Sequence, residues 1–311
     1  MDDSSHDSIC AVVVSYHPDA ELPRRLRALR EQVARIVVVD NGSGPDSEGL
    51  LRGAEQIDGL QLIRNETNLG IGAALNQGVG IALKDGFDWA LTLDQDSEPA
   101  QDLVSALLHA YAQCGEPRQI AMVAPQVIDA GLGRVAPFLT KHGRFLYRRV
   151  SCTGDVLDPV TTVISSGALL RVGAWTALGG FREDFFMDYV DTEYCLRAQL
   201  RGYRVVAACG ARLFHHLGDR RRSRFGLWTL YPTFHAPERW YTISRNRVPM
   251  LRSYALRFPH WLMYESVATA FVFFRMLVSE DQRGAKLAAA IRGTWDGLRG
   301  RMGKPSWVGY P

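Results

Sequence analysis

The feature that most constrains this chain is a repeated order of short apolar runs and helical stretches over its first half. The apolar runs include ICAVVVSY (9–16), RIVVVDNGS (35–43) and WALTLDQDS (89–97), and the first is followed by the helical ELPRRLRALREQV (21–33). Continuous Val and Ile runs are typical of strands buried on both faces, and a repeated strand–helix order predicts parallel pairing with right-handed crossovers. The sequence therefore predicts an α/β fold with an open, Rossmann-like, mostly parallel sheet and helices on both faces.

Acidic residues stand at the ends of these runs. Asp40 follows VVV, and Asp94 and Asp96 follow ALTL. Open α/β sheets bind ligands beyond the carboxyl ends of their strands, so Asp40, Asp94 and Asp96 could line one crevice. Residues two apart in a strand point to the same side, and two close carboxylates repel each other unless something positive lies beside them. The alternative is a solvated turn, because Asp, Ser and Pro are common turn formers.

A glycine-containing segment lies at the entry of a predicted helix. NLGIGAALNQG (68–78) carries Gly70 and Gly72 after the third apolar run. It lacks the third glycine of the dinucleotide fingerprint, so a plain tight turn is one interpretation. The other is a ligand contact, because the first N–H groups of a helix suit a phosphate or a ribose.

Acids also gather before a helix predicted over about residues 190–201. Asp188, Asp191 and Glu193 fall within six residues, beside the aromatic-rich turn FFMDY. Acids near a helix N-terminus serve as caps and as partners of the helix dipole. Capping accounts for one of the three, so the group is also a candidate for chemistry.

A later strand-like segment ends in His215 and His216 and precedes RRRSR (220–224). A single histidine is commonly a polar core or surface residue, and an arginine run is commonly a solvated loop. Beside an anionic ligand the arginines become candidate clamps, because a guanidinium pairs with phosphate through two hydrogen bonds.

The charge of the chain is unevenly distributed. Residues 196–311 hold 20 Lys and Arg and 6 Asp and Glu, a balance of +14, while residues 1–195 hold the remaining 16 and 27, a balance of −11. A basic region of this kind could meet nucleic acid, anionic lipid or a phosphorylated ligand. No zinc-finger, RNP or basic-zipper pattern accompanies it, so the sequence does not favour nucleic acid.

The N-terminus and the cysteines bear on the compartment. MDDSSHD has neither a basic nor an apolar region, so no secretory signal is expected and the chain is predicted to stay in the cytosol. The five cysteines are odd in number, widely spaced and never in a CxxC pair. This argues against a disulfide framework and a cysteine zinc site, and it predicts reduced thiols in or near the core. The five are Cys10, Cys114, Cys152, Cys195 and Cys209.

The most apolar stretch is residues 259–280. Glu265 and Arg275 interrupt it and leave a charge-free run of nine residues, short of the roughly 20 that span a bilayer. With the basic segment behind it, and with Trp261 and Trp295, the tail predicts amphipathic helices that lie on an anionic membrane surface. The alternative is that these helices cover the domain's own core.

Eight motifs, in register from residue 8 to about residue 304, together resemble one family. They are VVVSYHPD, VVVDNGS, NLGIGAALNQG, LDQDSEP, ISSGALL, DYVDTEYCLRAQLRGYR, HHLGD and WDGLRGRMGK. In this order they resemble the inverting glycosyltransferases of family 2, specifically the bacterial rhamnosyltransferases. The resemblance implies the GT-A fold, dTDP-L-rhamnose as donor and a divalent metal, Mg²⁺ or Mn²⁺. It divides the chain into a GT-A domain (1–255) and a basic helical tail (256–311), the domain having a nucleotide-sugar half (about 8–130) and an acceptor half (about 131–255).

The resemblance also assigns roles on the donor side. Asp40 matches the aspartate that hydrogen-bonds the nucleobase, and Ser15 and Tyr16 match the loop beneath the base. Asp94 and Asp96 match the DxD pair, in which the second acid binds the metal and the first contacts the ribose or the metal shell. Further nucleotide-sugar contacts are implied for Asn41, Gly70, Asn76 and Gln95.

On the catalytic side, Asp191 matches the general base that removes the acceptor proton. Asp188 and Glu193 are supporting acids, and Val190 stands where the family usually has Glu, so Asp188 could take over part of the role of that acid. His215 matches a histidine directed at the metal or the diphosphate. Arg220 and Arg245 are candidate clamps for the diphosphate.

These assignments predict an inverting transfer of L-rhamnose to a hydroxyl of a glycolipid or glycan, at the cytosolic face of the inner membrane. The whole-length pattern resembles rhamnosyltransferases of rhamnolipid synthesis, although O-antigen and polysaccharide rhamnosyltransferases share most of the motifs. The alternatives are a family 2 transferase of another nucleotide sugar, a nucleotidyltransferase, and a non-catalytic membrane-associated protein.

Overall fold

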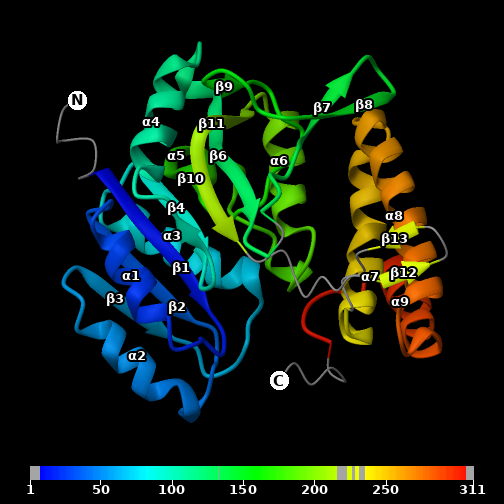
Figure 1. Cartoon of the computed structure of the whole chain (residues 1–311), viewed down its shortest axis with the longest axis horizontal. Coiled ribbons are helices and arrows are strands. Elements are labelled where there is room, and N and C mark those ends of the chain that lie inside the picture. The colour runs from blue at the N-terminus through cyan, green and yellow to red at the C-terminus, as the bar shows by residue number, and fades with distance from the viewer. Residues whose placement is uncertain (1–7, 132, 216–222, 226–227, 231–234, 306–311) are drawn as a thin grey trace.

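The computed structural model describes residues 8–131, 133–215, 223–225, 228–230 and 235–305, and its central feature is a mixed β-sheet (Figure 1). The strands of this sheet are β1 (Ile9–Ser15), β2 (Arg35–Asp40), β3 (Leu60–Arg64), β4 (Trp89–Asp94), β5 (Glu98–Pro99), β6 (Ile120–Asp129), β9 (Val156–Leu157), β10 (Ala168–Arg171) and β11 (Arg204–His215). Their order is β3-β2-β1-β4-β10-β6-β11-β5, and β9 pairs with β11. β1, β2, β3 and β4 are parallel, whereas β10 runs antiparallel between β4 and β6.

Helices cover both faces of the sheet, which explains the continuous apolar runs. The helices are α1 (Leu22–Arg30), α2 (Glu48–Glu55), α3 (Ile71–Lys84), α4 (Leu103–Gln113), α5 (Val172–Leu178) and α6 (Val190–Leu200). Alternate residues of β1 enter two different cores: Val12 packs with residues of α3, α5 and α6, and Val13 packs with residues of α1, α2 and α4. Both faces of each central strand are therefore buried, as predicted from the Val and Ile runs.

The register of the sheet brings the strand ends together. Ser15 at the end of β1 pairs with Asp40 at the end of β2, and Val14 pairs with Asp94 at the end of β4. The predicted placement of these acids along one edge of the sheet is confirmed. The predicted helix near residues 190–201 is α6, and its first turn carries Asp191 and Glu193.

Three C-terminal helices stand beside the sheet (Figure 1), namely α7 (Pro237–Tyr254), α8 (Pro259–Ser279) and α9 (Arg283–Leu298). α9 packs back along α7 at two glycines. A Cβ at Gly293 would lie 2.2 Å from the carbonyl oxygen of Tyr241, and one at Gly297 would lie 2.4 Å from that of Arg245. These distances leave no room for a side chain, so the glycines set the spacing of the two helices. We therefore propose that the helical unit begins at α7, ahead of the predicted boundary at residue 255.

Two hairpins complete the described part. β7 (Phe138–His142) pairs with β8 (Leu146–Val150) in an antiparallel hairpin. β12 (Ser223–Phe225) pairs with β13 (Trp228–Leu230). The β7–β8 hairpin contacts α8, where the rings of Tyr147 and Tyr264 meet edge to face at 5.2 Å.

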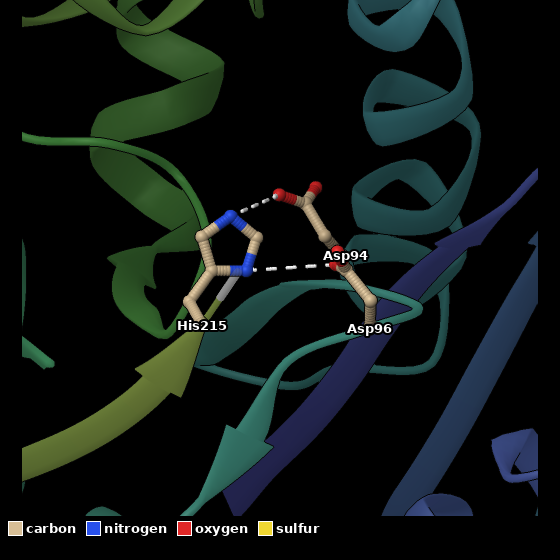
Figure 2. Close-up of side chains that lie close together, drawn as sticks. All are labelled: Asp94, Asp96 and His215. Atoms are coloured by element: carbon tan, nitrogen blue, oxygen red, sulfur yellow. Dashed lines mark ion pairs between the residues drawn. The ribbon is translucent and has the colours of Figure 1, made fainter. Parts of the chain in front are cut away.

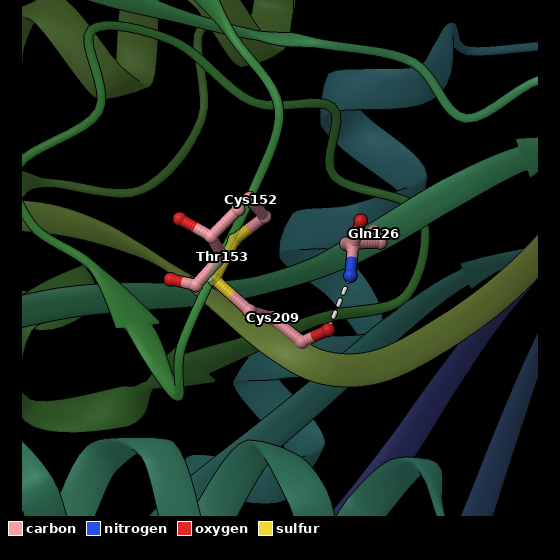
Figure 3. The surroundings of a disulfide bond; sticks show 4 residues. All are labelled: Gln126, Cys152, Thr153 and Cys209. Carbon is pink, nitrogen blue, oxygen red and sulfur yellow. Dashed lines mark hydrogen bonds between the residues drawn. A yellow bond between two sulfur atoms is a disulfide. The ribbon is translucent and has the colours of Figure 1, made fainter.

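The expectation that all five cysteines are free thiols is wrong for two of them. Cys152 and Cys209, 57 residues apart in sequence, form a disulfide (Figure 3). Cys10, Cys114 and Cys195 are free and buried. Cys209 lies where β11 departs from its register with β6, and the side-chain amide of Gln126 donates to its carbonyl oxygen. The disulfide ties the segment before β9 to this irregular part of β11. Cysteine spacing alone contains no sign of this pairing, because only the fold brings the two chain segments together.

Candidate active site

Three side chains converge at the carboxyl end of the sheet (Figure 2). Asp94 is the last residue of β4, Asp96 follows in the next turn, and His215 is the last residue of β11. The His215 ring lies between the two carboxylates, with Nε2 3.7 Å from Asp94 Oδ2 and Nδ1 3.5 Å from Asp96 Oδ1. One ligand atom from each residue lies within 4.8 Å of the others. Residues 121 positions apart in the chain thus form one cluster.

The electrostatics of this cluster favour a bound cation. Burial, followed by the negative charges of Asp191 and Asp96, raises the pKa of Asp94 to about 7. Desolvation and neighbouring like charges both disfavour the ionised form of a carboxyl group, and a cation bound there would reverse both effects. The repulsion expected from the sequence of Asp94 and Asp96 is therefore present in the folded chain.

The donor set suits a divalent metal. Two carboxylates and an imidazole offer oxygen and nitrogen atoms close enough to share one ion. Carboxylate oxygens are preferred by Mg²⁺ and Mn²⁺, while imidazole is a ligand of several transition metals. The residues present therefore fit a divalent cation, which Asp94, Asp96 and His215 would hold.

Two serines, Ser97 and Ser166, connect the cluster of Asp94, Asp96 and His215 to the segment with the sequence ISSGALL. The Ser166 hydroxyl accepts the backbone N–H of Asp94 at 3.1 Å and lies 2.7 Å from the Ser97 hydroxyl, which lies 2.9 Å from His215 Nδ1. The ISSGALL motif thus supports both Asp94 and the histidine. The serines of this motif were not among the predicted site residues. The feature that could have indicated them is the pair of adjacent small polar residues ahead of an apolar strand.

The three acids near α6 have different surroundings. Asp188 is bonded by Arg239 at 3.1 Å and by the Thr242 hydroxyl at 2.9 Å. Glu193 is buried and forms an ion pair with Arg197 at 2.9 Å. It also accepts the Tyr254 hydroxyl at 2.7 Å. Both acids are thus neutralised within the protein, which favours structural roles for them.

Asp191 differs from its two neighbours. It accepts hydrogen bonds from the side chain and backbone of Ser165, and burial raises the pKa of its carboxyl group. It also lines a cavity of about 200 Å³ whose other walls come from β6, from the start of β7 and from residues 162–164. Asp191 is therefore a carboxylate at the edge of an open space, and its charge also acts on Asp94.

The order of elements and the position of the acidic cluster match a known family. Residues 10–173, just over half of the chain, match the model of glycosyl transferase family 2. The chain belongs to glycosyltransferase family 2. The fold agrees, because the S. aureus TarS 1-349 structure in complex with UDP-GlcNAc superposes with a TM-score of 0.56 at 15% identity, over 94% of this chain and 81% of that chain.

Two relatives of this glycosyltransferase are named as rhamnosyltransferases. The dTDP-rhamnosyl transferase RfbF of Shigella flexneri is 28% identical over 96% of this chain and 98% of its own length. The N-acetylglucosaminyl-diphospho-decaprenol L-rhamnosyltransferase of Mycobacterium tuberculosis (strain CDC 1551 / Oshkosh) is 26% identical over 68% of this chain and 76% of its own length. The predicted family and the predicted type of enzyme, a family 2 glycosyltransferase, are confirmed, and the similarity to these relatives agrees with the resemblance to bacterial rhamnosyltransferases.

The donor side of this glycosyltransferase is held by side-chain bonds to the backbone. Gln95 donates to the Tyr16 carbonyl at 2.9 Å and accepts its N–H at 2.8 Å, which joins the ends of β4 and β1. Asp40 accepts the backbone N–H of Ser43 at 3.2 Å and also the Ser43 hydroxyl. Ser15 is buried, and its hydroxyl has no hydrogen-bond partner among the described residues. Base contacts by Ser15, Tyr16 and Asp40 remain predictions, and Gln95 positions Tyr16.

Three residues predicted to contact the nucleotide sugar have hydrogen bonds or close contacts within the protein. The Asn41 amide bonds Asn68, Asn65 and the Leu69 N–H. The Asn76 amide is occupied by Phe181, Glu183 and Trp175. At Gly70, where φ is +90°, a Cβ would lie 2.5 Å from the Phe186 carbonyl oxygen, and the N–H groups of Gly70 and Ile71 already donate to Asn68 and Phe186. The N–H groups of Gly70 and Ile71 at the entry of α3 are therefore already bonded within the protein.

The predicted diphosphate clamp is corrected for Arg245. Its guanidinium is buried and donates to the carbonyl oxygens of Phe185 and Gly303 and to Asn246. It ties the C-terminal segment to the loop before α6, so it has no free face for a ligand. Arg220 lies outside the described residues.

Proposed function

We propose that this chain transfers L-rhamnose from dTDP-L-rhamnose to a hydroxyl of a lipid-like or lipid-linked sugar, with a divalent metal and with inversion at the anomeric carbon. The single observation that carries the proposal is the position of Asp191. It lies between the acidic cluster of Asp94, Asp96 and His215 and a cavity large enough for part of an acceptor.

The donor is supported by the full-length similarity to a dTDP-rhamnosyl transferase. The cluster at the end of β4 and β11 would hold the metal, and a divalent cation bound there neutralises negative charge that develops on a departing diphosphate. Asp40 and the backbone-locked Tyr16 stand at the neighbouring strand ends, where a nucleoside would lie beyond the sheet.

The acceptor class is supported by the composition of the cavity. Val127, Phe138, Val163 and Ile164 contribute apolar walls, and Asp191 and Thr192 stand at one side. An apolar space beside a carboxylate suits an acceptor whose reacting hydroxyl is close to a hydrocarbon group. A relative that acts on a decaprenol-linked sugar is consistent with this class.

In the proposed step the Asp191 carboxylate accepts the proton of the acceptor hydroxyl. The acceptor oxygen forms a bond to the anomeric carbon of rhamnose while the bond from that carbon to the diphosphate oxygen breaks. The bonding electron pair leaves with thymidine diphosphate. Because attack and departure take place on opposite sides, one displacement inverts the anomeric centre and gives an α-L-rhamnoside from a β-L-donor.

The test is a donor and acceptor screen read by product mass spectrometry. dTDP-L-rhamnose and a set of UDP-sugars are paired with lipid-linked sugars and with lipid-free glycans, with and without EDTA. We expect a rhamnoside only from dTDP-L-rhamnose, with higher kcat/KM for acceptors that carry an apolar chain. Release of dTMP would indicate a nucleotidyltransferase instead, and transfer from a UDP-sugar would indicate another member of the family.

A cavity variant separates donor from acceptor. Ala136 lines the cavity, and Ala136→Phe should fill part of it. We expect a higher KM for lipid-bearing acceptors with unchanged donor affinity, whereas Ala28→Phe on the exposed side of α1 should change neither. Equal loss with lipid-free acceptors would contradict an apolar acceptor site.

A further inference from the structure

Helices α8 and α9 expose a long apolar surface, here called the α8–α9 face. Its side chains are between 41% and 63% exposed and recur every three or four residues, as on one side of a helix. Large apolar patches that are exposed on a protein mark sites of interaction with other proteins or with membranes. The residues are Met263, Val267, Phe271, Phe274 and Leu277 on α8, and Leu287, Ile291, Trp295 and Leu298 on α9.

The opposite side of α8 is attached to the protein along its length. Trp261 and Met276, near the two ends of the helix, are buried. Between them Glu265 is buried, forms an ion pair with Arg247 at 2.9 Å and accepts the Tyr189 hydroxyl. α8 is apolar and long enough to cross a membrane, with a mean hydropathy of 1.4 over an 18-residue window, yet only 11% of that window is buried. The nine charge-free residues between Glu265 and Arg275 underestimated the apolar length of this helix. Glu265 and the buried Trp261 and Met276 face the protein, so a bilayer would meet the opposite side, which carries Phe271 with the Arg275 guanidinium 5.8 Å from the centre of its ring.

A basic cavity lies next to the start of α8. It measures about 670 Å³, and its walls include Lys141, Arg144 and Arg257. The described residues that line it include no acid, and the nearby Asp158 is already bonded to Arg204. His260 also lines it and is 4% exposed, with an Nδ1 that has no hydrogen-bond partner among the described residues. Three cations and a buried, unpaired ring nitrogen form a site for an anion such as a phosphate.

Exposed apolar side chains accompany this cavity. Phe145 and Leu146, at the tip of the β7–β8 hairpin, are each 57% exposed, and Leu256, beside Arg257, is 94% exposed. The Arg144 guanidinium lies 5.3 Å from the centre of the Phe145 ring. In Figure 1 this hairpin and the helices α8 and α9 occupy the same side of the molecule. Apolar tips beside a cationic cavity match the two layers of a lipid surface, acyl chains and headgroups.

We propose that this side of the molecule docks on an anionic lipid bilayer, with the α8–α9 face and the hairpin tip in the outer acyl region and a lipid phosphate in the basic cavity. The inference does not rest on the donor or acceptor proposed above.

Charge favours a bilayer over a second copy of the chain. A two-fold contact through this side would set the cavity cations of one copy near those of the other, and residues 196–311 carry a balance of +14. Anionic headgroups instead neutralise these cations, and this attraction is screened by salt.

The experiment is sedimentation of the full chain with vesicles, without donor or acceptor. We expect binding to phosphatidylcholine vesicles that contain phosphatidylglycerol, weaker binding to pure phosphatidylcholine, and release in high salt. Lys141→Glu with Arg257→Glu should weaken binding about tenfold or more. Phe145→Ser with Leu256→Ser should weaken it on both kinds of vesicle.

Matched variants control for net charge and for surface polarity. Lys84→Glu with Arg27→Glu makes the same charge change on exposed positions of α3 and α1, and Leu83→Ser removes an apolar side chain that is 44% exposed. These controls should bind vesicles like the unmodified chain. Circular dichroism and thermal melts show whether every variant is folded.

Four results would overturn the proposal. Controls that lose as much binding as the cavity variant would reduce the effect to net charge. Inorganic phosphate that saturates the cavity, with no vesicle binding, would assign the site to a soluble phosphate compound. A dimer that dissociates on Phe145→Ser and Leu256→Ser, again without vesicle binding, would assign the surface to a second copy. Release from membranes by detergent alone would indicate that α8 spans the bilayer.

Discussion

Two groups of carboxylates in this glycosyltransferase differ in what faces them. Glu193 and Glu265 are buried, and each has an arginine and a tyrosine hydroxyl as partners. Asp94 and Asp96 face His215, and burial, followed by the negative charges of Asp191 and Asp96, raises the pKa of Asp94 to about 7. An acid paired with arginine holds elements together, whereas acids whose ion pairs among the described residues are with His215 alone are available to a cation that arrives with a ligand.

The contrast is sharpest within α6 and the turn before it. Asp188, Asp191 and Glu193 are neighbours in sequence, yet two are ion-paired to arginine and one bonds to a serine beside a cavity. Neighbours along a helix turn point in different directions, so each meets a different part of the fold. Adjacency in sequence therefore does not imply a shared function.

The largest expected effect comes from the group of Asp94 and Asp96. Asp96→Ala should leave the protein folded and lower turnover by several orders of magnitude, because the metal loses a direct ligand while β4 ends before this residue. EDTA should have the same effect on the unmodified enzyme, with recovery on adding Mn²⁺ or Mg²⁺. The control is Asp58→Ala, a fully exposed acid that should have no effect. Full turnover in EDTA would remove the metal from the mechanism.

Asp191→Asn tests an acid that belongs to neither of the two groups of carboxylates. The amide keeps the shape of the side chain but cannot accept a proton, so kcat should fall about 100-fold to 10,000-fold. Donor affinity, measured by calorimetry, should stay the same. Asp188→Asn is the matched variant, and its kcat should change less because Asp188 is committed to Arg239 and Thr242. The reverse order of the two variants would make Asp188 the base.

The sequence was sufficient to predict the sheet and the position of the acids at its edge. Continuous Val runs and the turn after β4 depend on local chemistry, so Asp40, Asp94 and the start of α6 were placed correctly. What the sequence could not supply was the set of partners across the fold. Asn76, for example, has the residue type of a sugar ligand, but its amide is bonded to residues 99 to 107 positions away.

Arg245 and the disulfide between Cys152 and Cys209 are two further features whose partners across the fold the sequence could not supply. The Arg245 guanidinium has the chemistry of a phosphate clamp, and only the packing of α7 against the C-terminal segment buries it. Cys152 and Cys209 have no spacing signal, and only the path of residues 151–155 beside β11 joins them. Side-chain chemistry gives the possible roles, and long-range contacts select among them.

Glu193→Gln examines the neutralised group. Removing one charge from a buried pair leaves Arg197 partly uncompensated, and the free energy of unfolding should fall by about 3 kcal/mol, the lower end for such pairs, because carbonyl oxygens also bind this arginine. Denaturant unfolding measures this loss, and kcat per folded molecule should be unchanged. Glu48→Gln is the matched control, since Glu48 and Arg52 form the same i,i+4 pair on the surface and should contribute about 0.5 kcal/mol or less. Loss of kcat without loss of stability would give Glu193 a role in the reaction.

The smallest effect is expected at Ser166, which belongs to neither group but supports the group of Asp94 and Asp96. Its hydroxyl accepts the Asp94 N–H and contacts Ser97, which in turn contacts His215, so it is a positioning residue. Ser166→Ala should weaken Mn²⁺ affinity about 10-fold to 100-fold, as for other residues that orient metal ligands, while the melting temperature changes little. Ser166→Thr keeps the hydroxyl and should restore the affinity. Ser105→Ala on α4 removes a hydroxyl that donates to the Asp102 carbonyl and should leave Mn²⁺ binding unchanged. If Ser166→Ala instead lowers stability with no change in Mn²⁺ affinity, the serine only packs the loop, and the orientation of Asp94 and His215 must come from their own strands.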